Sequence, residues 1–308
     1  MESVHRTVLL NETIEGLFTP QKAGNKELIV IDATFGGGGH SKEILEKYSD
    51  VKIIALDQDK SAWEKAKGKF KGLEKRIFFV NKNFKDLDNL VVGLPNSNPT
   101  TKFDGIIFDL GLSSDQLENS GRGFSFIRNE PLLMTMKENP LPEDLTAIDI
   151  VNGWSEKSLA DIIYGYGEER FSRKIAKGII EARKKNKIET TLGLVKVIES
   201  SVPTAYKRGR LHFATKTFQA LRIAVNDELG ALQVGLQKGF DVLKKGGRIS
   251  VISFHSLEDR IVKRFFKEKE KEKKAKLINK KPITAKEEEI KNNPRSRSGK
   301  LRILEKII

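Results

Sequence analysis

Apolar and polar positions are arranged in blocks along the first third of the chain. Four short apolar runs, rich in β-branched and aromatic residues, are typical of buried strands; they occupy residues 27–35, 51–59, 76–84 and 103–114. Segments with helical spacing, "SKEILEKYSD" and "KSAWEKAKGKF", follow the first two runs. This alternation predicts an α/β fold with a parallel, doubly wound sheet whose strand-end loops share one rim.

The pattern changes after the fourth run. Between residues 115 and 213 the apolar positions recur at helical spacing, and no strand-like run interrupts them. One long helical segment then covers 213–245, and strand character returns at 246–254. We therefore expect a discontinuous α/β domain, residues 1–114 and 214–308, with an inserted helical domain at 115–213. The polar segment 268–293 is expected to be a mobile surface excursion.

The charge of the chain is lopsided. Its 308 residues contain 56 Lys and Arg against 42 Asp and Glu, a formal net charge of +14. Residues 261–308 alone contain 17 Lys and Arg against 7 Asp and Glu. Such an excess indicates a polyanionic partner, for example nucleic acid. The alternating signs of "KRFFKEKEKEKKAK" are also typical of a solvated helix, so charge alone leaves both readings open.

Several classes of protein are disfavoured by composition. The chain has no cysteine, which excludes disulfides and thiolate metal sites, and its four histidines do not form a metal-ligand pattern. We therefore expect no metal in the chemistry. No run approaches the ~20 apolar residues of a membrane span, and the N-terminus lacks the features of a signal peptide. These features predict a cytoplasmic protein without a membrane partner; a homodimer is compatible with the sequence.

A run of four glycines in "DATFGGGGHS" follows the first predicted strand, where glycine indicates a tight turn or a ligand close to the backbone. The phosphate-loop pattern is absent, and the dinucleotide pattern fails because Ser41 stands where a third glycine should be. Asp57 closes the next strand, 21 positions after Gly36, where a carboxylate can accept the hydroxyls of a ribose. A ribose site without a pyrophosphate loop points to S-adenosylmethionine.

Other strand ends carry candidate groups on the same rim. Asp32 can order the glycine loop or receive an ammonium group, Phe84 can lie against adenine, and Asp109 ends the fourth strand. Asp86 is a weaker candidate for the base. Any one carboxylate could instead cap a helix or stabilise a loop, but their joint position favours a binding site.

Longer strings carry a resemblance to a known family. They include "HRTVLLNE", "DATFGGGGHS", "DLGLSSDQLE", "YGEERF", "ATKTFQALRIAVNDEL" and "SFHSLEDRIVKRFF", and they extend from His5 to the C-terminal "NPRSRSGKLRILEK". On these strings the chain resembles the bacterial 16S ribosomal RNA cytosine-N4 methyltransferases of the RsmH or MraW type. The resemblance implies a Rossmann-like methyltransferase fold with an inserted helical domain. It implies as substrate a cytidine in the decoding region of 16S rRNA, in free rRNA or in the small ribosomal subunit.

The resemblance also implies positions for the cofactor. It places S-adenosylmethionine contacts at Gly38, Gly39, His40, Asp57, Phe84, Asp109 and Gln116. All but Gln116 lie at or beside the strand ends chosen from the pattern, which add Asp32 and Gly36.

Methylating an exocyclic amine requires acceptors for its hydrogens and in-line alignment with the methyl–sulfur bond, and such positioning supplies roughly 7–11 kcal/mol. We expect Asp109, with Ser113 or Ser114, to orient the amine; helix capping is the alternative role for the serines. His255 is a second candidate, as a neutral acceptor of the amine proton. Its alternative is a structural histidine beside a Ser256 cap.

Basic residues near the C-terminus are candidates for RNA phosphates. Phosphate contacts would position the RNA, while a flipped-out base is recognised in the pocket. The candidates on the helix after His255 and in the C-terminal tail are Arg260, Lys263, Arg264, Arg295, Arg297, Lys300 and Arg302.

The chain departs from the family pattern in one segment. "PLLMTM" (131–136) has Leu133 and Thr135 where the family usually has Asp and Arg, and Phe213 stands where many members have proline. Loss of both members of an ion pair can be nearly neutral, but loss of an RNA contact would impair activity. A non-catalytic RNA-binding or assembly factor is therefore an alternative function, and a small-molecule methyltransferase is a third.

Overall fold

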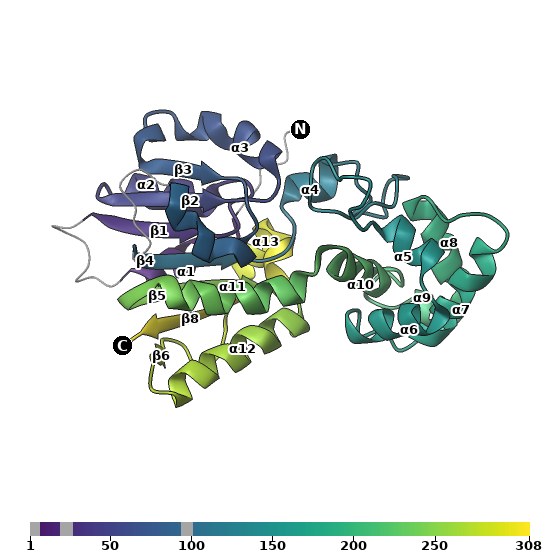
Figure 1. Ribbon diagram of the computed structural model, residues 1–308. Coiled ribbons are helices and arrows are strands. Elements are labelled where there is room, and N and C mark those ends of the chain that lie inside the picture. The colour runs from purple at the N-terminus through teal and green to yellow at the C-terminus, as the bar shows by residue number, and fades with distance from the viewer. Residues whose placement is uncertain (1–6, 19–26, 94–100) are drawn as a thin grey trace. The chain divides into compact units, whose positions relative to one another are not determined.

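The computed structural model describes residues 7–18, 27–93 and 101–308 (Figure 1). The chain forms two compact units: residues up to Leu112 together with Leu229–Ile308 make the first, and Ser113–Glu228 the second. Helix α10 (Thr215–Asn226) lies beyond the expected limit of 213, yet it contacts α5 (Ala147–Gly153) and α6 (Glu156–Gly165) of the second unit. The expected domain limits of 115 and 213 remain a prediction.

In the described part of the chain, eight strands of the first unit form one sheet, in the order β3-β2-β1-β4-β5-β8-β6, with β7 also pairing with β8. Strands β1 to β5 run parallel, whereas β6, β7 and β8 are antiparallel additions. The strands are β1 (Leu28–Asp32), β2 (Val51–Leu56), β3 (Ile77–Val80), β4 (Phe103–Asp109), β5 (Leu243–Ser253), β6 (Ala275–Leu277), β7 (Ile283–Thr284) and β8 (Lys300–Lys306).

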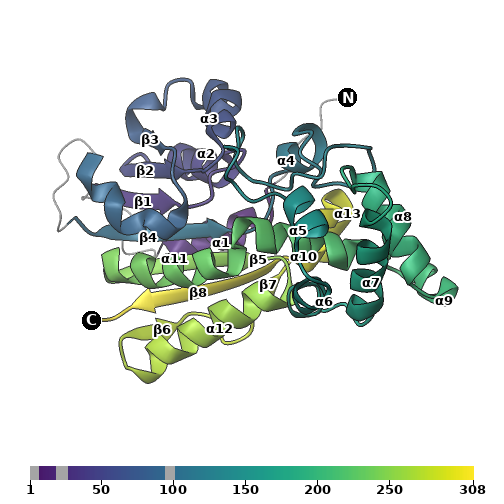
Figure 2. The ribbon, with the colours of Figure 1, turned by 45° about the vertical axis from the view of Figure 1, so that its right-hand side comes forward.

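Helices cover both faces of this sheet (Figures 1 and 2). The α-helices of this part of the chain are α1 (Leu10–Leu17), α2 (Gly39–Lys47), α3 (Lys60–Ala66), α11 (Glu228–Val242), α12 (Ser256–Lys271) and α13 (Glu287–Asn292). Short 3₁₀ segments are η1 (Lys67–Phe70), η2 (Glu74–Arg76), η3 (Phe84–Gly93) and η4 (Pro294–Ser298).

Alternate strand residues face opposite layers, because successive side chains of a strand point to opposite sides of the sheet. Ile31 packs with residues of α11 and α12, whereas its neighbour Val30 packs with residues of α1 and α2. Central strands are thus apolar on both faces, as is usual in a covered parallel sheet. The predicted α/β, Rossmann-like fold is confirmed.

Several local expectations were wrong. The predicted helix over 213–245 is two helices, because Asp227 takes a left-handed conformation (φ 46°, ψ 42°) and ends α10. The third strand ends at Val80, four residues before Phe84. Residues 268–293 are not a mobile excursion, since they contain the end of α12, strands β6 and β7, and α13.

The second unit is built from helices, which are α4 (Ser114–Asn119), α5, α6, α7 (Ser172–Arg183), α8 (Thr191–Ser201), α9 (Thr204–Lys207) and α10. Hydroxyl caps begin several of them: Ser113, Thr146, Ser155 and Thr190 each accept a backbone N–H of the first turn. None of the described helices, in either unit, has the length and apolar character needed to cross a bilayer.

Candidate active site

The end of β1 and the glycine loop are joined by Asp32. Its carboxylate accepts hydrogen bonds from the Ser41 hydroxyl at 2.6 Å and the Thr34 backbone N–H at 3.3 Å. The side chain is 2% exposed, and this burial raises the pKa of Asp32 to about 6 despite the two donors. Of the two roles expected for Asp32, ordering of the loop is the one that these contacts perform.

The carboxylate of Asp57 meets the same loop from the end of β2. One oxygen accepts the Gly36 N–H at 2.7 Å and the other accepts the Asp59 N–H at 2.8 Å. Burial raises the pKa of Asp57 to about 6, with Asp59 and Asp32 adding to the rise. Each carboxylate oxygen has a further lone pair, so Asp57 can still accept a ribose hydroxyl while it holds the loop.

Bare backbone is required in the loop for a steric reason. Gly38 has φ +73°, and a Cβ there would lie 2.7 Å from the ring of Phe35 and 2.9 Å from that of Phe70. Gly39 begins α2, and a Cβ there would meet the Thr7 hydroxyl at 1.8 Å. The loop therefore presents main chain and a helix N-terminus at the strand ends, as a ligand with close backbone contacts requires.

Asp109, at the end of β4, is the least satisfied polar group among these residues. Its Oδ2 lies 3.7 Å from Nδ1 of the buried His40 on α2. Oδ1 is buried, and no donor of the described residues reaches it. Burial, and after it the charges of Asp32 and Glu258, raise the pKa of Asp109 to about 8. A buried acceptor without a donor is costly, and such groups are concentrated where substrates bind.

Thr34 was missed by the sequence analysis. Its hydroxyl accepts the backbone N–H of Asp109 at 2.6 Å and so ties the end of β1 to the end of β4. Asn81, after β3, likewise donates to the Asp57 carbonyl at 2.8 Å. A threonine in "DATF" and an asparagine after a strand give no distinctive signal in the sequence, because such residues are common in turns.

Phe84 packs in the layer between the sheet and α11. Its ring contacts that of Phe108 edge-to-face at 5.6 Å and lies where a Cβ on Gly235 would be, 2.6 Å from the nearest ring atom. The residue is only half-buried, which leaves part of the ring open to a ligand. Its predicted contact with adenine remains a prediction.

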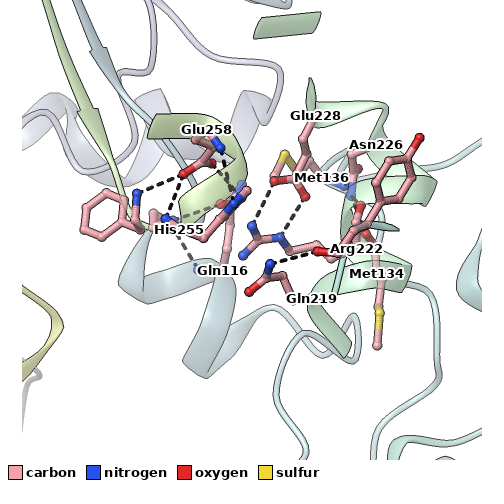
Figure 3. Close-up of polar contacts among 12 residues, drawn as sticks. Gln116, Met134, Met136, Gln219, Arg222, Asn226, Glu228, His255 and Glu258 are labelled. Carbon is pink, nitrogen blue, oxygen red and sulfur yellow. Dashed lines mark hydrogen bonds and ion pairs between the residues drawn. The ribbon is translucent and has the colours of Figure 1, made fainter. Parts of the chain in front are cut away.

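His255 caps α12 and does not have the geometry of a base (Figure 3). Its Nδ1 accepts the Glu258 N–H at 3.4 Å, and Nε2 lies 3.2 Å from Oε1 of Glu258. The other oxygen of Glu258 accepts the N–H groups of Phe254 and His255 at 2.8 and 3.3 Å. Nδ1 is used by the cap, and Nε2, buried beside the Glu258 carboxylate, makes no hydrogen bond with the described residues. The use of Nδ1 in the cap argues against His255 as proton acceptor, and the cap is His255 rather than Ser256.

In the second unit, Ser113 and Gln116 form a capping box at the start of α4. The Ser113 hydroxyl accepts the Gln116 N–H at 3.1 Å, and the Gln116 side chain accepts the Ser113 N–H at 3.0 Å. Ser114 is the first residue of the helix. Capping, the alternative considered for the serines, thus describes Ser113, and the orienting role of Ser113 and Ser114 stays a prediction.

The basic candidates differ in their surroundings. Arg260, Lys263 and Arg264 are exposed on α12, Arg297 is exposed in η4, and Arg295 is half-buried there. Arg302 is only 7% exposed and pairs with Asp259 at 2.7 Å, while Lys300 lies 3.6 Å from the same carboxylate. Burial and the ion pair with Asp259 disfavour the expected phosphate contact at Arg302, which remains a prediction.

A polar cluster in the second unit was also missed (Figure 3). Arg222 makes two hydrogen bonds to Glu228, at 2.7 and 2.9 Å. Asn226 donates to the Met134 carbonyl and accepts the Met136 N–H, both at 2.8 Å. Asn226 therefore fixes the backbone of the altered segment 131–136 from both sides.

The two residues that depart from the family pattern, Leu133 and Thr135, both make hydrogen bonds within the structure. Thr135 is 4% exposed, and its hydroxyl accepts the Lys137 N–H at 3.2 Å. Leu133 is half-buried, and its carbonyl accepts the Ala147 N–H at 2.9 Å. Backbone hydrogen bonds therefore hold the segment without an acid–base pair.

Parallel strands with a glycine loop after β1, an acid at the end of β2 and polar groups at the next strand ends fit the class of S-adenosylmethionine-dependent methyltransferases. The chain matches the MraW methylase family over residues 2–307, and it therefore belongs to that family.

Two curated relatives agree with this assignment. The Ribosomal RNA small subunit methyltransferase H of Persephonella marina is 47% identical over 278 residues, which cover 90% of this chain and 92% of the relative. That of Nostoc punctiforme is 47% identical over 304 residues, 99% of this chain and 94% of the relative. A crystal structure of an rRNA methylase from Streptococcus thermophilus covers 98% of each chain, with 11% identity and a TM-score of 0.46.

Proposed function

We propose that this protein transfers the methyl group of S-adenosylmethionine to the exocyclic N4 amine of a cytidine in the decoding region of 16S rRNA. The observation that carries the catalytic part is the buried Oδ1 of Asp109, which no donor of the described residues reaches. The choice of rRNA is supported by the relatives, which are named as methyltransferases of the small-subunit ribosomal RNA.

The residues at the strand ends suit the cofactor. Gly36, Gly38 and Gly39 supply a backbone surface next to the N-terminus of α2, and Asp57 is fixed with lone pairs available for the ribose. When bound, S-adenosylmethionine supplies an electrophilic methyl group on a cationic sulfonium.

Asp109 is the group best placed to handle the amine. The lone pair of a cytosine amine is delocalised into the ring, so an acceptor for an amine hydrogen favours the pyramidal nitrogen that can attack. In the reaction the N–CH₃ bond forms, the S–CH₃ bond breaks to leave a neutral thioether, and the nitrogen loses one proton. Asp109 accepts that proton through Oδ1 in its ionised form, which an opposite charge nearby favours.

The RNA would be positioned by phosphate contacts to the exposed side chains of α12 and η4, namely Arg260, Lys263, Arg264 and Arg297. A protein that acts on rRNA would work in the cytoplasm, which is the localisation that we propose. A homodimer stays a prediction that follows from neither the sheet nor the site.

Methyl transfer to purified small subunits that lack the modification tests this function. We expect labelled methyl incorporation with the wild-type protein, loss by at least about 100-fold in Asp109→Asn, and little change in Asp88→Asn. Asp88 is a suitable control because its carboxylate pairs with Lys238 at the surface of the same unit. Bound cofactor with no transfer would favour the assembly factor, and transfer only to small amines would favour the small-molecule enzyme.

A further inference from the structure

Residues 7–9, here called the amino-terminal strap, lie against the glycine loop. A Cβ on Gly39 would lie 1.8 Å from the Thr7 hydroxyl oxygen and 3.1 Å from the Thr7 Cβ. The Thr7 side chain therefore fills the space that a side chain at position 39 would take. Gly39 begins α2 and is one of the residues at which the cofactor is expected. The strap thus supports the stretch of main chain that the cofactor needs.

The strap is held in an unfavourable backbone conformation. Leu9 has φ 50° and ψ 39°, in the left-handed region that residues other than glycine seldom adopt. Leu9 and Val8 are buried together with three residues of β5 and β8, namely Ile252, Leu301 and Ile303. A strained residue keeps its conformation only when its surroundings determine it. The shape of the strap therefore depends on the groups that hold Leu9.

Glu289 supplies a polar contact to Leu9 from the far end of the chain. Its Oε1 accepts the Leu9 N–H at 2.9 Å, across 280 residues of sequence. Glu289 is half-buried on α13. The Leu9 carbonyl in turn accepts the Thr13 N–H at 2.9 Å and so joins the strap to α1. A hydrogen bond to an ionised acceptor is stronger than one between neutral groups, so Glu289 is well suited to hold a strained residue.

The segment after α13 also packs on the strap. Gly299 follows η4, and a Cβ there would lie 2.9 Å from Cγ1 of Val8 and 3.1 Å from the Ser296 carbonyl oxygen. Ser296 is fully buried, and its hydroxyl donates to the Asn293 carbonyl at 2.7 Å. These contacts give the string "NPRSRSG" a structural task in addition to the expected phosphate contacts.

We propose that Glu289 is a positioning residue for S-adenosylmethionine and acts through the strap. Glu289 holds Leu9 in its left-handed conformation, and Leu9 places Thr7 against Gly39. Without this support the glycine loop adopts further arrangements that do not fit the cofactor. The apparent affinity then falls with the fraction of molecules that keep the fitting arrangement. This inference rests on the proposed function only for its cofactor, and it adds a residue to that site.

Calorimetric titration of the full-length protein with S-adenosylmethionine tests the role of Glu289. Glu289→Ala should raise Kd at least about fivefold, as expected if about one fifth of the molecules keep the fitting loop. Glu289→Gln keeps an oxygen that accepts the Leu9 N–H, so its Kd should stay within about twofold of the wild type. The matched control is Glu288→Ala, which removes an exposed carboxylate from the same turn of α13. Unchanged affinity in Glu289→Ala, no rescue in Glu289→Gln, or an equal loss in the control would overturn the proposal.

Hydrogen exchange of the protein without cofactor distinguishes positioning from a general loss of stability. In Glu289→Ala we expect faster amide exchange in peptides that cover residues 36–45, and unchanged exchange in peptides of α11. Equally faster exchange in both regions would show only a structural role and would contradict the proposal. Thr7→Gly removes the side chain that lies against Gly39 but leaves the Glu289 contact. It should reproduce both effects of Glu289→Ala, and unchanged cofactor affinity in Thr7→Gly would refute the part assigned to the strap.

Methyl transfer separates this inference from the proposed function. In Glu289→Ala we expect a raised KM for S-adenosylmethionine, with kcat and the KM for small subunits retained. If the wild type methylates subunits and Glu289→Ala binds the cofactor normally, the inference fails and the function stands. If the wild type methylates no subunit but cofactor affinity changes as expected in the variants, the inference stands and the function fails.

Discussion

The buried carboxylate of Asp109 should make the protein less stable as the pH rises. Its pKa of about 8 in the folded protein lies far above the ordinary value of 3.8. Between about pH 4 and pH 8, the folded state therefore keeps a proton on Asp109 that the unfolded state has already released. Because the folded state binds more protons in this window, the free energy of unfolding falls as pH rises through it.

The size of the effect follows from the difference between the two pKa values. At about 1.4 kcal/mol per pKa unit, a rise from 3.8 to about 8 sets an upper limit of about 6 kcal/mol. The side chain is 23% exposed, so solvent screens part of the penalty, and we expect a loss of about 2–3 kcal/mol. Asp109→Asn has no charge to bury and loses no hydrogen bond at Oδ1. The variant should thus be inactive but more stable than the wild type at pH 8.5.

Urea unfolding at pH 5 and pH 8.5 measures the free energy of unfolding of the wild type and of Asp109→Asn. The two proteins should have similar stability at pH 5 and differ by about 2–3 kcal/mol at pH 8.5. Some pH dependence should remain in the variant between pH 4 and 6, because Asp32 and Asp57 have pKa values raised to about 6. The control Asp88→Asn should follow the wild type. Equal pH dependence in wild type and Asp109→Asn would refute the reasoning.

Three further predictions concern the cofactor and the second unit. In Gly38→Ala the residue keeps φ +73°, and its new Cβ would clash with the Phe35 ring. The variant should lose about 1–3 kcal/mol of stability and should not bind the cofactor in calorimetry. Retained binding would contradict the steric account. Arg222→Ala leaves Glu228 buried without its partner and should cost about 3–5 kcal/mol in urea unfolding, whereas removing both side chains should cost less; equal costs would contradict the pairing. Cofactor affinity should rise between pH 6 and 8, because binding of a cation favours ionised Asp109 and releases its proton; calorimetry in buffers of different ionisation enthalpy should detect the proton, and its absence would contradict the assignment.

The sheet and its rim were predictable because they depend on local patterns. Apolar runs separated by helical segments impose parallel strands, and Asp32, Asp57 and Asp109 each end a strand or follow one directly. Strands that share a direction bring their ends together, so Asp57 and Asp109, 25 and 77 positions beyond Asp32, converge on one loop. Composition and spacing could place these carboxylates without knowledge of their hydrogen bonds.

What the sequence could not show depends on contacts between distant segments. The sequence predicts Arg302 as a phosphate-binding cation of the C-terminal tail. In the structure β8 pairs with β5 and brings Arg302 to Asp259, 43 residues away. For His255 the sequence left a proton acceptor and a structural histidine open, because it does not show that Nδ1 accepts the Glu258 N–H three residues on. The break at Asp227 also escaped prediction, since the apolar periodicity of α10 and α11 continues across a single left-handed residue.

The altered segment "PLLMTM" bears on whether the enzyme is active. Asn226 and Arg122 hold this backbone, and Arg122 donates to the Met136 carbonyl at 2.8 Å. Loss of an acid and a base together therefore leaves the loop supported, in agreement with the view that such a double change is nearly neutral. We expect Leu133 and Thr135 to be tolerated.

The most direct test of the account is nucleoside analysis of 16S rRNA after reaction with labelled S-adenosylmethionine. The rRNA is taken from small subunits that lacked the modification, digested, and compared between wild-type protein and Asp109→Asn. The account predicts label in N4-methylcytidine at a single decoding-region position with the wild type and none with the variant. Label in another nucleoside, or the same N4-methylcytidine with Asp109→Asn, would contradict it.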